Sequence, residues 1–126
     1  MISADRPLSD AVRKRIARTV SISGLHDLRP LMHTKMNGVL HLGEAEALSE
    51  SAALLRPFGA IPLICWVGGG ERPEFIRQSQ LMAQMWEGLH TPTYCIVEGR
   101  HNHFTVIEGL RKPQSESTRC LLKPPT

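Results

Sequence analysis

Two apolar runs, each passing directly into a loop with a charged side chain, most constrain how this chain can fold. One covers residues 61–67 and continues through three glycines to Glu71, and the other covers residues 93–97 and continues to His103. A third run, residues 19–24, ends in glycine. Such short, nearly continuous apolar runs are typical of parallel strands covered by helices on both faces. About three parallel strands are therefore expected.

The segment between the second and third runs has the clearest helical pattern. It opens at Pro73, ends near Gly88, and carries one recurrent face, made of Phe75, Ile76, Ser79, Met82, Ala83 and Trp86. A second, short helix is expected over residues 103–110. Strands alternating with helices indicate an α/β fold with a parallel sheet. Because ligands bind beyond the carboxyl ends of such strands, the loops carrying Glu71 and His103 are expected to face one site.

Length and composition indicate one small domain, since the chain has 126 residues of which 41% are apolar. No stretch approaches the roughly 20 apolar residues of a membrane span, and no signal-peptide pattern opens the chain. We expect no membrane contact and a cytoplasmic location. The domain is expected over residues 1–111, with a disordered tail over 112–126. The irregular stretch over residues 25–58 is expected to shape a pocket.

Glu71 and His103 are the candidate catalytic residues. A histidine that acts as a general base needs a carboxylate on its other ring nitrogen, and neighbouring strands can bring the two together. Glu74 is the competing carboxylate, although a position at a helix N-terminus also suits it for complementing the helix dipole. The chain has no Gly-x-Ser-x-Gly motif that would mark a serine nucleophile.

Other candidate sites receive less support. His101 and His103 form a His-x-His pair, but zinc requires further ligands that the sequence does not assign, so no metal and no cofactor are expected. The cysteines are interpreted as structural thiols, and they are Cys65, Cys95 and Cys120. A basic cluster over residues 13–18 is interpreted as a solvated helix face, so nucleic acid is not an expected partner.

Three ordered segments together resemble a known family. Residues 21–31, 67–79 and 99–104 are similar to the C-terminal half of α/β-hydrolases of the kynurenine formamidase (arylformamidase) and carboxylesterase group. The resemblance implies that His103 is the catalytic histidine. It also implies that Glu71 occupies the place of the family's acidic residue, usually an aspartate, which is one methylene shorter. Glutamate serves this role in other α/β-hydrolases.

The resemblance further implies the C-terminal part of an α/β-hydrolase fold, and hence a fragment of a serine hydrolase that cleaves small formamide or carboxylic ester substrates. The nucleophile and oxyanion hole would precede Met1, so this chain is expected to be inactive alone. Asp27 and Arg29 would organise a loop and pair with each other. The open edge of the strand at residues 19–23 is expected to bind another copy or the missing N-terminal half. The alternative is a non-catalytic interaction module that associates through this edge.

Overall fold

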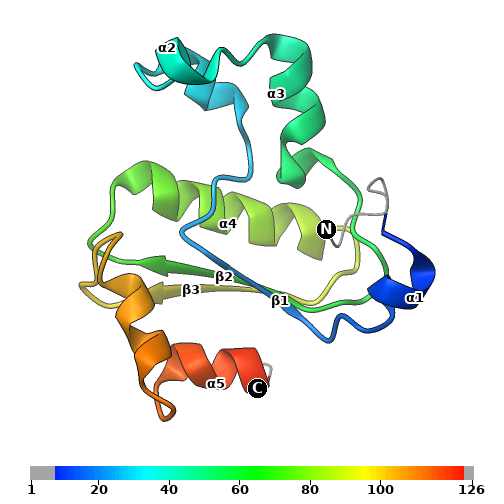
Figure 1. The fold of residues 1–126 in the computed structure, drawn as a ribbon, viewed down its shortest axis with the longest axis vertical. Coiled ribbons are helices and arrows are strands. Elements are labelled where there is room, and N and C mark those ends of the chain that lie inside the picture. Colours follow the sequence, from blue (N-terminus) through cyan, green and yellow to red (C-terminus); the bar gives the residue numbers. More distant parts are fainter. Residues whose placement is uncertain (1–7, 124–126) are drawn as a thin grey trace.

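A three-stranded parallel sheet forms the centre of the molecule (Figure 1). The computed structural model describes residues 8–123. The strands are β1 (Thr19–Ile22), β2 (Leu63–Gly68) and β3 (Thr93–Glu98), in the spatial order β1-β2-β3. Their register places the carboxyl ends of β2 and β3 together, because Gly68 pairs with Glu98. The three apolar runs are therefore parallel strands.

Helices cover both faces of this sheet, as Figure 1 shows. The long helix α4 (Pro73–Glu87) packs on one face, and the 3-10 helix η3 (Val106–Arg111) and α5 (Glu116–Leu122) lie on the other. A short helix α1 (Asp10–Arg13) precedes β1 and is capped by the Ser9 hydroxyl, which accepts a hydrogen bond from the Val12 amide. The two-faced cover explains why β2 is buried along its whole length.

Alternating side chains of β2 divide the core into two halves. Cys65 and Leu63 pack toward α4, where the buried partners are Ala53, Met82, Ala83 and Trp86. Ile64 and Trp66 pack toward the opposite layer with Val106 and Cys120. This alternation is the ordinary consequence of the two-residue repeat of a strand. Both halves meet at the middle strand, so β2 is the most firmly held element of the site described below.

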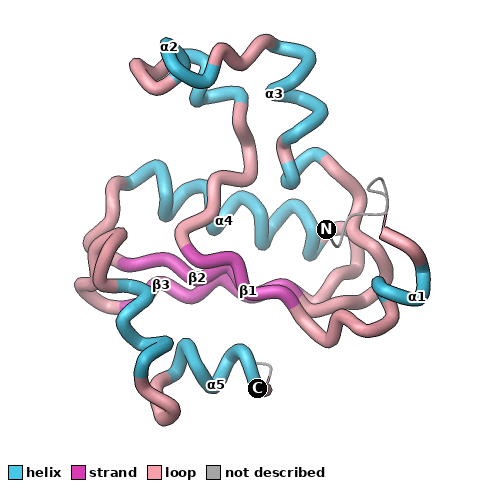
Figure 2. Tube along the Cα trace, in the orientation of Figure 1, coloured by secondary structure: helices cyan, strands magenta, loops and turns pink. Residues whose placement is uncertain are grey.

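The connection from β1 to β2 forms an excursion, residues 25–58, that stands away from the sheet (Figure 2). It contains η1 (Arg29–His33), α2 (Asn37–Leu40), α3 (Glu44–Glu50) and η2 (Ala52–Leu54). The buried Gln78 of α4 ties the start of the excursion to that helix. The Gln78 Oε1 atom accepts hydrogen bonds from the amides of His26 (2.9 Å) and Asp27 (2.7 Å), and its Nε2 donates to the Asp27 carbonyl (2.9 Å).

Two expectations about the C-terminal third are corrected. The expected helix over residues 103–110 is the 3-10 helix η3, which begins only at Val106 because Asn102 Oδ1 first caps the amides of Phe104 and Thr105. Within the expected disordered tail, residues 116–122 form α5. Ser115 caps that helix, and Cys120 is buried against the sheet. Residues 124–126 of the tail lie outside the described part.

The edge strand β3 is less covered than a fully buried run would be, since Tyr94, Cys95 and Val97 are exposed. Cys95 is therefore a surface thiol, whereas Cys65 and Cys120 are buried. No helix within residues 8–123 is long and apolar enough to cross a bilayer.

Candidate active site

The two loops that follow β2 and β3 pack directly against each other. A Cβ atom at Gly69 would overlap the carbonyl oxygen of Gly99, and one at Gly68 would overlap the carbonyl oxygen of His101. The Gly70 amide also donates to the His101 carbonyl at 3.0 Å. Glycine is needed at these positions because any side chain would separate the loops. The run of glycines after β2 thus brings the two loops into backbone contact.

This contact brings Glu71 and His103 together. His103 Nδ1 lies 2.7 Å from Glu71 Oε2, and the Glu71 side chain is fully buried, whereas that of His103 is 49% exposed. A carboxylate can only accept a hydrogen bond, so the ring carries its proton on Nδ1. Nε2 is then the nitrogen free to accept a proton. The pair has the geometry of a general base with its orienting acid.

The imidazole is also held by aromatic packing. The Phe75 ring, from the first turn of α4, lies 4.7 Å from the His103 ring, centroid to centroid. Phe104 contacts the same ring edge-on at 5.8 Å. Phe75 thus connects the helix after β2 to the histidine after β3, which restricts the ring to few orientations.

The second oxygen of the acid, Glu71 Oε1, accepts two hydrogen bonds. The donors are the Gly68 amide, at 2.9 Å, and the Ser23 hydroxyl at the end of β1. Burial by itself would raise the pKa of Glu71, but these hydrogen bonds and that of His103 outweigh it and hold the pKa below its usual value. The acid therefore stays charged beside the histidine at neutral pH.

Ser23 is a site residue that the sequence interpretation missed. Its φ of 50° lies in the left-handed region, which a serine rarely adopts, and backbone outliers of this kind cluster at functional sites. The available signal in the sequence was its position. Ser23 lies at the end of one apolar run, and the loops that carry Glu71 and His103 follow the other two runs. All three strands therefore contribute to one hydrogen-bond network.

The competing residues lie in other contacts. Glu74 binds Arg77 through both carboxylate oxygens (2.7 and 2.8 Å) and also accepts from Gln78 Nε2 (2.8 Å). His101 Nδ1 lies 3.3 Å from the Thr105 hydroxyl. No group of three or more His, Cys, Asp or Glu side chains suited to a metal ion occurs within residues 8–123.

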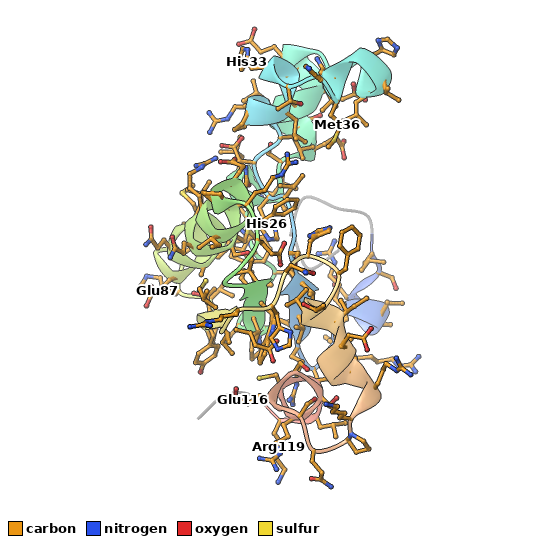
Figure 3. The ribbon with its side chains drawn as sticks, turned by 90° about the vertical axis from the view of Figure 1, so that its left-hand side faces the viewer. His26, His33, Met36, Glu87, Glu116 and Arg119 are labelled. Atoms are coloured by element: carbon orange, nitrogen blue, oxygen red, sulfur yellow. The ribbon has the colours of Figure 1, made fainter. Side chains whose placement is uncertain are left out.

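Two further histidines and the Asp27–Arg29 pair lie in the excursion over residues 25–58. Figure 3 shows His33 near the far end of the excursion, well away from the sheet. His26 is buried beside the Ser21 hydroxyl (3.3 Å), and this burial lowers the pKa of its ring. Asp27 and Arg29 form the expected pair, with Arg29 Nε and Nη2 bound to the two carboxylate oxygens at 2.9 and 2.8 Å.

Two arginines of the basic cluster before β1 contact other parts of the fold. The Arg13 guanidinium lies 4.6 Å from the centroid of the Phe58 ring. Arg18 Nη1 donates to the Cys120 carbonyl at 3.4 Å. These two contacts hold Arg13 and Arg18 against other parts of the fold.

A cavity of about 320 Å³ adjoins the Glu71–His103 pair. It is lined by Ile22, Ser23, His103, Phe104 and Ile107. Its residues come from the end of β1, the loop after β3 and η3. A ligand in this cavity would therefore lie against the exposed histidine.

Comparison with known proteins finds a similarity to a solved structure. No protein-family model and no curated protein matches the chain. A crystal structure from Silicibacter sp. TM1040, described as a putative thioesterase, matches with a TM-score of 0.84 and 32% sequence identity. The match covers 92% of this chain and 42% of the other. The chain thus shares the fold of part of that structure and spans less than half of its length.

This similarity corrects the family prediction. The resemblance to kynurenine formamidase, arylformamidases and carboxylesterases is wrong, because the matching structure is described as a putative thioesterase. The expected α/β architecture with three parallel strands is observed, whereas its assignment to the C-terminal part of an α/β-hydrolase fold is contradicted by the match to the structure described as a putative thioesterase. The prediction of a serine hydrolase acting on formamides or esters is likewise contradicted, because the matching structure is described as a putative thioesterase. Loops that carry a glycine run and a histidine after parallel strands indicate a fold and a site, but they do not by themselves determine which family the chain belongs to.

Proposed function

We propose that this chain carries a thioester-hydrolysing site in which Glu71 orients His103 and His103 Nε2 acts as the general base. The observation that carries the proposal is the 2.7 Å contact between His103 Nδ1 and the buried Glu71 carboxylate. Its location beyond the carboxyl ends of two parallel strands is the usual place for a ligand in such a sheet. The similarity to a putative thioesterase supplies the class of bond.

The proposed reaction uses water as the nucleophile. Within residues 8–123 no side chain is hydrogen-bonded to His103 Nε2, and the nearby Ser23 hydroxyl is committed to Glu71. Nε2 accepts a proton from water as the water oxygen attacks the thioester carbonyl, and Glu71 stabilises the imidazolium. The carbon–sulfur bond then breaks, and the imidazolium returns the proton to the thiolate. The products are a carboxylic acid and a thiol.

A thioester suits a site built on one acid–base pair. A thiol has a pKa of about 8.5, so it departs as a thiolate with little protonation. An alkoxide is a far more basic leaving group and needs fuller assistance from a general acid. We therefore expect the wild-type protein to release thiol from a short acyl thioester faster than it releases alcohol from the matching oxygen ester. A thiol-reactive dye follows the first reaction, and the released carboxylic acid allows the two rates to be compared.

Replacing Glu71 with Gln should slow thioester hydrolysis by roughly 10²- to 10³-fold. The new amide nitrogen would donate to His103 Nδ1, so the ring proton would move to Nε2 and remove the lone pair that accepts the proton. Glu74→Gln is the matched control, one helical turn away, and should change the rate by less than about three-fold. Equal effects of the two substitutions on the initial rate of thiol release would refute the assignment.

We also infer that the open edge of β1 pairs with β1 of a second copy. The amides of Thr19 and Ser23 donate to Pro62 and Trp66 on the β2 side. Because alternate residues of a parallel strand bond to the same neighbour, the amides of Val20 and Ile22 face the open edge. The strand carries no charge or proline that would discourage pairing.

The substitution Val20→Pro should abolish this association. It removes an amide that faces the open edge and leaves the β2-facing hydrogen bonds of β1 intact. Val20→Ala is the control, since it shortens the side chain but keeps the amide. In sedimentation equilibrium the wild type and Val20→Ala should form dimers, and Val20→Pro should be a monomer. A wild type that is monomeric at about 100 μM would contradict the inference.

We further infer a cytoplasmic location from the cysteines. The chain has an odd number of cysteines, three, and two of them, Cys65 and Cys120, are buried. Free cysteines that pack as small apolar side chains are typical of proteins in a reducing compartment.

A further inference from the structure

The cavity beside His103 has the character of a site for a hydrocarbon chain. Its volume of about 320 Å³ lies at the lower end of the range for small-molecule sites. Three apolar side chains, those of Ile22, Phe104 and Ile107, provide most of its wall. They come from β1, the loop after β3 and η3, so that three separate segments converge on one apolar space.

Two of these apolar side chains are unusually exposed for their type. Phe104 is 79% exposed and Ile107 is 50% exposed. The Phe104 ring meets the His103 ring edge-on, and its backbone amide donates to Asn102 Oδ1 at 2.9 Å. Together with Ile22 in the cavity wall, Phe104 and Ile107 present an apolar surface beside the candidate base that suits contact with an apolar ligand.

The cavity offers few polar groups that could bind a charged ligand. Among residues 8–123, no Asp, Glu, Lys or Arg lines it. The Ser23 hydroxyl and His103 Nδ1 are both occupied by Glu71, so Nε2 is the one polar atom of these two side chains left to meet a ligand. A charged group placed among Ile22, Phe104 and Ile107 would lose its hydration without gaining a partner.

We propose that this cavity binds the neutral, aliphatic acyl group of the thioester, with the acyl chain against Ile22, Phe104 and Ile107. The inference rests on the proposed function and deepens it by naming the substrate class. The carbonyl lies at the His103 end of the cavity, and the thiol part points to solvent. The side chain of Ile107, from η3, forms the wall that the chain contacts.

The test measures binding without turnover. Butanamide, hexanamide and octanamide are neutral acyl probes that lack a thiol leaving group, and their affinities are measured by calorimetry and by the NMR shifts of the His103 ring. Each added methylene should tighten binding by roughly two-fold or more, because it removes further apolar surface from water, although the cavity is partly open. Equal affinities for the three amides, or no shift at His103, would overturn the proposal.

Substitutions in η3 test whether the acyl chain lies against Ile107. Ile107→Asp should abolish the dependence of affinity on chain length, and Ile107→Ala should reduce it. Leu110→Asp is the matched control on the same helix and should keep the dependence, because Leu110 does not line the cavity. If Ile107→Asp unfolds, Ile107→Ala alone decides the outcome, and an unchanged dependence in that variant counts against the proposal.

The binding result and the catalytic result can fail separately. His103→Asn should still bind octanamide more tightly than butanamide, because the apolar wall is unchanged. Chain-length-dependent binding without thioester hydrolysis by the wild type would remove the proposed function and leave an acyl-binding cavity. Hydrolysis without chain-length dependence would keep the function and remove the cavity assignment.

Discussion

The variant His103→Asn is expected to hydrolyse thioesters roughly 10³- to 10⁴-fold more slowly than the wild type while it unfolds at nearly the same temperature. The asparagine amide reaches about as far as Nδ1 of the imidazole, so it can still donate to Glu71 Oε2. It has no atom at the position of Nε2. The substitution therefore removes the proposed base and keeps the hydrogen bond of the buried acid, and general-base catalysis supplies about 10²- to 10⁴-fold in rate.

His101→Asn is the matched control for this variant. His101 lies two residues earlier in the same loop, is exposed, and contacts Thr105 instead of Glu71. Its replacement should leave the rate within about three-fold of the wild type. The measurement is the initial rate of thiol release together with thermal unfolding by circular dichroism. Full activity in His103→Asn, or an equal loss in His101→Asn, would exclude His103 as the base.

The largest effect on stability is expected for Gln78→Leu, which should lower the free energy of unfolding by about 3–5 kcal/mol. Leucine has a similar size but no polar atoms. The amides of His26 and Asp27 and the carbonyl of Asp27 would lose the hydrogen bonds that Gln78 provides. Each buried group left without a partner costs about 1–3 kcal/mol, and relaxation toward water at the start of the excursion should offset part of the sum.

The control for Gln78→Leu is Gln80→Leu on the exposed side of the same helix. It should change the free energy of unfolding by less than about 0.5 kcal/mol. Urea unfolding followed by circular dichroism gives both values. A loss below about 1 kcal/mol in Gln78→Leu would show that the excursion is held mainly by other contacts.

The sheet was largely predictable from the sequence, because each strand is a short apolar run and burial on both faces leaves a direct pattern. The pairing of Glu71 with His103 was also anticipated, since parallel strands bring their carboxyl ends to one edge. Ser23 and Gln78 were missed. Their roles depend on which backbone groups lie near them after folding, and a single polar residue in an apolar pattern does not reveal its partner.

The C-terminal helix shows a different limit. Residues 116–122 have few apolar residues at helical spacing, and prolines flank them, so the composition predicted disorder. The structure shows a helix that Ser115 caps and that buries Cys120 against Ile64 and Trp66. Tertiary packing, rather than intrinsic propensity, stabilises such a short helix.

The class of bond was the least predictable property. A carboxylate and a histidine on neighbouring loops serve hydrolases of formamides, esters and thioesters alike, because all three reactions require the same proton transfer. The motif segments therefore indicated an acid–base pair correctly placed in space but assigned it to the wrong family. In the proposed acyl-binding cavity, the acyl group would be selected by side chains such as Phe104 and Ile107, which no motif specifies.

The backbone contact between the two glycine-containing loops has a mechanical consequence. Because the main chain at Gly68 and Gly69 touches the carbonyl groups of His101 and Gly99, neither loop can shift without displacing the other. Glu71 and His103, which these loops carry, are therefore held in a fixed relative position by main-chain packing as well as by their own hydrogen bond. A ligand that displaces the loop carrying His103 would therefore also displace the end of β2, the central strand of the sheet.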